Sequence, residues 1–168
     1  MSLPEDNAAT FEILLKWLYG KRLGDPATKR GWEMNYVYLA RLDVLADKYD
    51  ITGVRNEIID AFFECQAKKV SPPSWETVAL VYGNSTSSSM LRKLLAGLFA
   101  WHIDMKSYQD TSFSTWLHEQ PEFAADLAIA VGKRQCTGEI SPFKRKREEF
   151  YYKSADWPED EKSGPKLA

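Results

Sequence analysis

The chain has 168 residues, of which 44% are hydrophobic and 27% are charged, and its formal net charge is −2. This composition is ordinary for a globular protein, and it gives the molecule no excess of positive charge for binding nucleic acid or an acidic substrate. The two cysteines lack CxxC spacing, which argues against a zinc site or redox motif and favours a reducing intracellular compartment, cytoplasm or nucleus. No apolar run approaches the ~20 residues of a membrane span, and the first residues lack a signal peptide pattern, so we expect no membrane partner.

The first predicted helix begins after residue 6 or 7. Asp6 or Asn7 can cap it, its apolar residues run from Phe11 to Tyr19, and Gly20 would end it. A loop rich in glycine and basic residues follows.

The central feature is a predicted αα-hairpin over residues 35–68. Apolar side chains recur at three- and four-residue spacing on both sides of the corner Asp50-Ile51-Thr52-Gly53, as in two amphipathic helices. We expect Ile51 to pack between these helices.

Further helices are predicted by the same periodicity near residues 75–82, 90–102, 112–117 and 121–131, with Ser74 as the cap of the first and Gly132 as the end of the last. No alternating strand pattern appears. The expected fold is therefore an all-α bundle of about six helices built on the hairpin. Three units are predicted: a helical unit at 1–68, a helical extension at 69–135, and a mobile tail at 136–168 without apolar periodicity.

Several segments resemble the BTB/POZ family, in the form found in filamentous fungi. Residues 4–20 are similar to the third helix of that domain, which typically reads Pro-Glu-x-Phe-x-x-Leu-Leu-x-x-Leu-Tyr-x-Gly. Residues 42–51, which contain Leu-Ala-Asp-Lys-Tyr, resemble the helix after it, and residues 54–60 resemble the next. Residues 81–86 and 89–95 resemble the helical extension of the fungal proteins, so the likeness spans residues 3–103.

The resemblance implies a non-enzymatic protein–protein interaction module, either a substrate adaptor for ubiquitin transfer or a transcription-linked scaffold. The strand-containing half of the family's domain would lie before Met1, so we expect the helix surface that it normally covers to be open. The predicted contacts with a protein partner are therefore Phe11, Trp17, Leu18 and Tyr19. Self-association of the chain stays open.

Residues that could carry chemistry have simpler interpretations. His102 lies at the end of an apolar helix face, and Cys65 falls on the apolar face of the hairpin's second helix, where a buried thiol is the default. Cys136 is expected near the surface. The series Asp43, Asp47 and Asp50 lacks the oxygen-rich loop of a metal site, so we expect a solvated face. We therefore predict no catalytic residue, cofactor or metal.

A basic run, Lys144-Arg145-Lys146-Arg147, is the sharpest local feature of the predicted tail. Four adjacent cations are typical of a nuclear import signal or of phosphate contacts. The acidic residues that follow favour instead a solvated run. A helical nuclear protein that contacts nucleic acid through this run is thus the alternative function. The neighbouring aromatic residues either fold back onto the helices or present a docking segment: Phe150, Tyr151, Tyr152 and Trp157.

Overall fold

The computed structural model describes residues 8–20, 23, 36–67, 73–103, 110–137 and 146–153. Within these residues every regular element is helical, which confirms the predicted all-α class. The elements are α1 (Ala8–Gly20), α2 (Tyr36–Lys48), α3 (Thr52–Ala67), α4 (Trp75–Asn84), α5 (Met90–His102), α6 (Thr111–Glu119), α7 (Pro121–Thr137) and the short 3-10 helix η3 (Arg147–Phe150).

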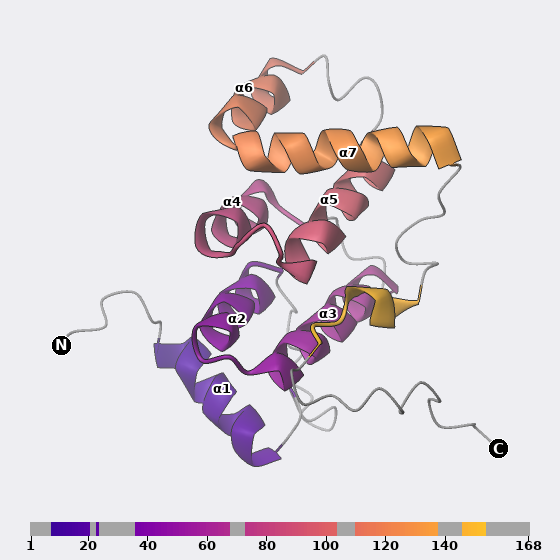
Figure 1. Cartoon of the computed structure of the whole chain (residues 1–168). Coiled ribbons are helices and arrows are strands. Elements are labelled where there is room, and N and C mark those ends of the chain that lie inside the picture. The colour runs from indigo at the N-terminus through magenta and orange to yellow at the C-terminus, as the bar shows by residue number, and fades with distance from the viewer. Residues whose placement is uncertain are drawn as a thin grey trace.

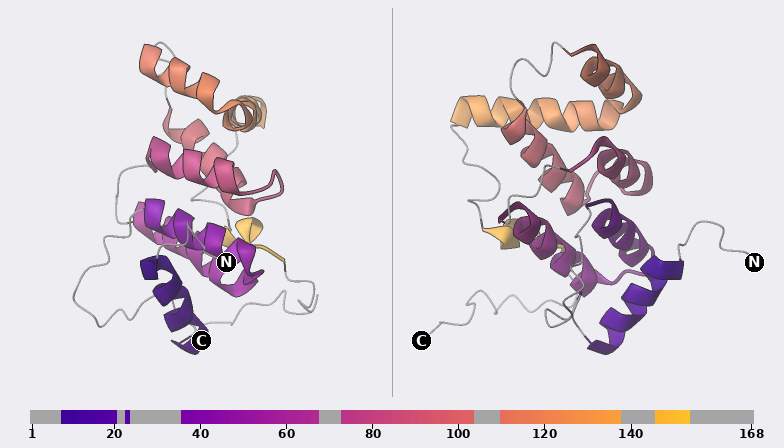
Figure 2. Two further views of the ribbon diagram at one scale, coloured as in Figure 1. Left: turned by 90° about the vertical axis from the view of Figure 1, so that its left-hand side faces the viewer. Right: turned by 180° about the vertical axis from the view of Figure 1, so that it is seen from behind.

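The helices form a stack of successive pairs, α2 with α3, α4 with α5, and α6 with α7 (Figure 1). Helix α2 contacts α4, and α5 contacts α7, so the pairs are joined along the stack. Helix α1 lies against α2 at one end, and α6 and α7 lie at the other end (Figure 2). As the terminal helix, α1 turns one side toward the stack and the other side outward.

One apolar core runs from α1 to η3 through the whole stack. An aromatic cluster closes its upper part, with the Trp75 and Trp116 ring centroids 4.3 Å apart and Phe99 and Phe123 5.3 Å apart. The largest fully buried side chains are contributed by five of the helices, α1, α2, α3, α5 and α7: Leu14, Leu42, Val54, Ile58, Ile59, Phe62, Leu91, Leu94, Leu95, Leu98, Phe123 and Leu127.

At the hairpin corner, α2 ends in the left-handed conformation that glycine usually adopts, but the residue there is Asp50. Asp50 has a φ of 53°, the Ile51 N–H donates to the Ala46 carbonyl (2.9 Å), and the Asp50 N–H donates to the Asp47 carbonyl (3.0 Å). These bonds satisfy carbonyls that the end of α2 would leave without partners. Ile51 is partly buried against the core, as predicted.

Helix ends are set by side-chain caps and by packing. The Ser74 hydroxyl accepts from the Thr77 N–H at 3.3 Å, which confirms the predicted cap of α4. The predicted end of α7 at Gly132 is wrong, because the helix continues to Thr137. Arg134 explains the extension, since its guanidinium donates to the Ala100 carbonyl at 2.6 Å and ties the added turn to α5.

Part of the predicted tail, residues 146–153, lies against the helices, which is the fold-back arrangement considered for its aromatic residues. Residues 147–150 form η3, which packs on α3 and α5, and Phe150 is buried (Figure 1). Periodicity could not reveal this contact, because the segment is short and partly extended. Trp157 lies outside the described residues.

Candidate functional site

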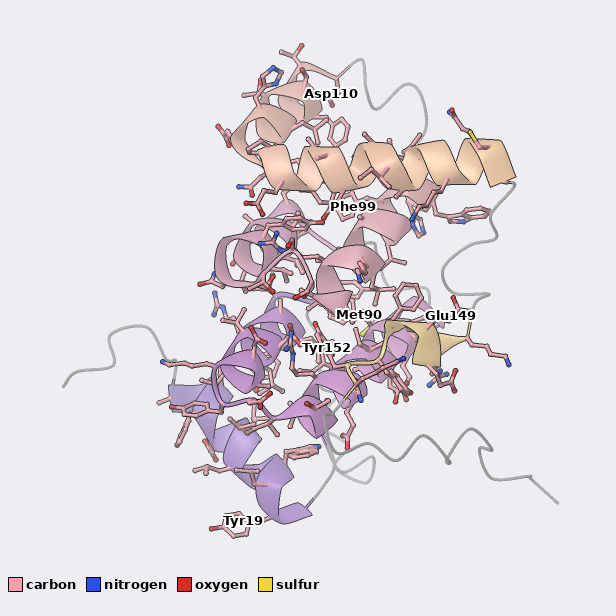
Figure 3. All side chains as sticks on the ribbon, in the orientation of Figure 1. Tyr19, Met90, Phe99, Asp110, Glu149 and Tyr152 are labelled. Atoms are coloured by element: carbon pink, nitrogen blue, oxygen red, sulfur yellow. The ribbon has the colours of Figure 1, made fainter. Side chains whose placement is uncertain are left out.

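Helix α1 carries two apolar faces, of which one is buried. Leu14 and Trp17 point into the core. A neighbouring side of the helix, here called the outer α1 face, is exposed: Phe11, Leu15 and Leu18 each keep 39% of their surface accessible and Tyr19 keeps 91%. These residues fall at positions i, i+4, i+7 and i+8, so they form one stripe along the helix. Figure 3 shows Tyr19 pointing away from the molecule.

Three of the four predicted partner-binding residues therefore lie on the outer α1 face: Phe11, Leu18 and Tyr19. Trp17, the fourth, does not lie on this face. It is 7% exposed, and its ring packs over the start of α3. A Cβ added at Gly53 would lie 3.0 Å from the Trp17 ring, which shows how closely α1 approaches α3. Leu15 was missed, although its four-residue spacing from Phe11 is visible in the sequence.

The surroundings of the outer α1 face are aromatic and charged. The Tyr49 ring, at the end of α2, lies 6.5 Å from the Phe11 ring and extends the apolar surface beyond α1. Lys16 pairs with Glu12 at 2.7 Å on the exposed side, and a hydrogen bond from this lysine lowers the pKa of Glu12. The outer α1 face thus combines an apolar stripe with an exposed ion pair on the same helix.

The predicted solvated face of aspartates is wrong for Asp43, which is 1% exposed. The Arg55 Nε donates to its Oδ1 at 3.1 Å, and the same guanidinium pairs with Asp47. Burial raises the pKa of Asp43 to about 6, against the opposing effect of Arg55. Arg55 and Asp43 are 12 positions apart on opposite sides of the hairpin corner, so no local sequence pattern pairs them. These carboxylates hold the hairpin together, and no cluster suited to a metal ion occurs among the described residues.

The histidines bond to their own helices. The Nδ1 of His102 lies 2.9 Å from the Leu98 carbonyl oxygen, and that of His118 lies 2.7 Å from the Ser114 carbonyl oxygen. Cys65 is buried, as predicted, and Cys136 is exposed. These contacts are those of helix-end and core residues, and they do not assemble a general base with a nucleophile.

Two cavities lie among the upper helices. The larger, of about 420 Å³, opens between α5, α7 and η3, where Arg134 lies over the Trp101 ring at 4.8 Å. The smaller, of about 350 Å³, adjoins Arg92 and Glu122, which form an ion pair.

The guanidinium of Arg92 is fully engaged beside the smaller cavity. It donates to the Tyr82 carbonyl at 2.6 Å and to the Ser85 hydroxyl at 3.0 Å, in addition to its contact with Glu122. The Tyr82 hydroxyl donates to Asp126 at 2.8 Å, and burial together with this bond raises the pKa of the tyrosine. This buried network joins α4, α5 and α7 and serves the fold.

The predicted basic run is only partly described. Lys144 and Arg145 lie outside the described residues, and Lys146 is exposed. Arg147 donates to Asp60 at 3.3 Å and lies 5.8 Å from the Phe63 ring centroid. At least one cation of the run is therefore paired with an acidic side chain of α3.

None of the described helices is long and apolar enough to cross a membrane. No protein-family model matches the chain, and neither a curated protein nor a solved structure matches it.

Proposed function

We propose that the chain is a non-enzymatic protein–protein interaction module that binds a protein partner through the outer α1 face. The observation that carries this proposal is the exposed stripe of Phe11, Leu15, Leu18 and Tyr19 on a helix whose neighbouring side is already in the core. An apolar stripe at i, i+4 and i+7 is the pattern with which one helix fills a groove of a partner. Covering large exposed side chains with a partner releases water and supplies the binding energy.

The resemblance of residues 3–103 to fungal BTB/POZ proteins supports the same proposal. Members of that family act through protein contacts, which suggests an intracellular adaptor for ubiquitin transfer or a transcription-linked scaffold. The partner is a protein, and a second copy of the chain is one candidate. The nucleic-acid alternative gains no support, because Arg147 of the basic run is engaged with Asp60.

A photo-crosslinking experiment tests the proposal. A photoreactive amino acid replaces Tyr19, the most exposed residue of the outer α1 face, and a control protein carries it instead of Ile129, which is 58% exposed on α7. We expect a discrete protein adduct from position 19 that is absent from position 129. The double substitution Leu15→Glu and Leu18→Glu should abolish the adduct while circular dichroism shows retained helix content. Equal adducts from both positions, or adducts that survive the double substitution, would refute the proposal.

A further inference from the structure

We propose that α3 and the first turn of α5 form a peptide-binding site, which residues 147–152 fill in cis. The ligand it fits is a segment with the pattern Arg-x-x-Phe-Tyr-Tyr, in which the first four residues form a 3-10 turn and the chain is extended from the first tyrosine. This site, here called the α3 site, consists of Arg55, Asn56, Asp60 and Phe63 together with Ser89 and the main chain of Leu91. It does not depend on the outer α1 face or on the proposed function.

Asn56 reads the main chain of the bound segment. Its Oδ1 accepts from the Tyr152 N–H at 2.7 Å, and its Nδ2 donates to the Tyr152 carbonyl at 3.2 Å. One side-chain amide thus makes both main-chain contacts that a neighbouring strand would make. Tyr151 is extended, with φ −78° and ψ 143°. This pair of bonds recognises an extended backbone whatever the side chain.

The other residues of α3 read the side chains. Asn56, Asp60 and Phe63 fall at i, i+4 and i+7, so they form one stripe along the helix. Asp60 Oδ1 accepts from the Tyr151 hydroxyl at 2.7 Å and from Arg147 at 3.3 Å. The Phe63 and Phe150 ring centroids lie 5.9 Å apart.

Tyr152 is held from both sides. The Arg55 guanidinium carbon lies 3.5 Å from its ring centroid. The Tyr152 hydroxyl accepts from the Leu91 N–H at 3.1 Å and lies 3.0 Å from the Ser89 hydroxyl. This contact is at the start of α5, next to Met90 (Figure 3). The N–H groups of a first helical turn lack helical partners, so this position is suited to a tyrosine oxygen. The segment therefore carries four side-chain anchors besides its main-chain contact: Arg147, Phe150, Tyr151 and Tyr152.

The connection to α7 explains why the site is filled. Only residues 138–145 separate Thr137, at the end of α7, from Lys146. A tether of this length gives the attached segment an effective concentration on the order of millimolar. A free peptide of the same sequence therefore competes poorly until the anchors of the attached segment are removed.

The test uses the full-length chain with Phe150→Ala and Tyr152→Ala, which leaves every residue of the α3 site in place. A fluorescent peptide with the sequence of residues 145–153 is titrated, and its anisotropy is measured. We expect this variant to bind the peptide at least ~10-fold more tightly than the wild type, because the cis competitor has lost its anchors. Adding Asn56→Ala should weaken binding about 10-fold. Asn84→Ala, an exposed asparagine on α4, is the matched control and should leave binding unchanged.

A folded double variant that fails to bind the peptide would overturn the proposal. An affinity for the peptide that does not change when Asn56→Ala is added would overturn it as well. If the double variant does not fold, hydrogen exchange of the wild type decides. The N–H of Tyr152, bonded to Asn56, should exchange at least ~100-fold faster than the buried amides of α5, because the segment opens on its own. Equal protection would mean that the segment opens only when the whole chain unfolds, and the α3 site would then be a permanent part of the core.

Discussion

The Arg55 guanidinium lies over the ring of Tyr152, with 3.5 Å between its central carbon and the ring centroid, while its Nε donates to the buried carboxylate of Asp43 at 3.1 Å. One side chain of α3 thus neutralises a buried charge of α2 and supports the segment after η3. The hairpin and the docked segment are therefore coupled through Arg55.

Replacing Arg55 with methionine should make the stability of the fold strongly dependent on pH. Burial raises the pKa of Asp43 to about 6 from its ordinary 3.8, so the stability linked to its protonation is present below 3.8 and is lost as the pH rises through 6. Arg55 opposes this rise, and its removal lifts the pKa further. We expect Arg55→Met to cost about 3 kcal/mol at pH 7 and clearly less at pH 4, measured by urea unfolding.

The control for this pH dependence is the double variant Arg55→Met with Asp43→Asn. Without the buried carboxyl group, its loss of unfolding free energy should be nearly the same at pH 4 and pH 7. A single Arg55→Met variant whose loss does not change between these pH values would contradict the assignment of the effect to Asp43.

Arg92 should prove far more important than an exposed arginine. Its guanidinium is buried and bonds the Tyr82 carbonyl and Glu122, so Arg92→Met leaves main-chain acceptors without donors. We expect a loss of about 3 kcal/mol in denaturant unfolding. Arg41, which pairs with Glu76 at 3.5 Å and is 46% exposed, is the matched control, and Arg41→Met should cost less than about 1 kcal/mol. Similar losses for the two variants would rule out a buried Arg92 network.

Replacing a helical glycine with alanine should change the stability of the fold in opposite directions at Gly53 and Gly132. A Cβ at Gly53 would lie 3.0 Å from the Trp17 ring, whereas at Gly132 it would meet nothing within 4 Å. We expect Gly53→Ala to destabilise the fold by about 1 kcal/mol through crowding and Gly132→Ala to stabilise it by about 0.5 kcal/mol through helix propensity. Thermal unfolding of both variants checks this. Stabilisation by Gly53→Ala would show that α1 does not pack closely on the start of α3.

Adjacent leucines on α1 distinguish its two faces. Leu14 is 2% exposed and Leu15 is 39% exposed. Leu14→Ala should cost about 3 kcal/mol, because it opens a cavity in the core, while Leu15→Ala should cost less than about 1 kcal/mol. Denaturant unfolding of the two variants gives the comparison. A larger loss for Leu15→Ala would mean that the outer α1 face is buried in solution.

The sequence by itself determined the helices, because apolar periodicity and caps act over neighbouring residues. The hairpin with Ile51 at its corner and the Ser74 cap of α4 follow from such local signals. Helix ends followed less directly from local signals. Helix α7 continues beyond Gly132 because Arg134 donates to a main-chain carbonyl of α5, a contact that no local pattern reveals.

Only the tertiary structure decided which surfaces are left for partners. Both apolar faces of α1 have a helical spacing, three residues from Leu14 to Trp17 and four from Phe11 to Leu15, so the choice between them depended on the fit of the Trp17 ring over Gly53. Asp43 became buried because Arg55 approaches from the next helix, and residues 147–152 became ordered because a stripe on α3 receives them. Each outcome depends on residues distant in sequence that meet only when the helices pack, which is why periodicity could not predict it.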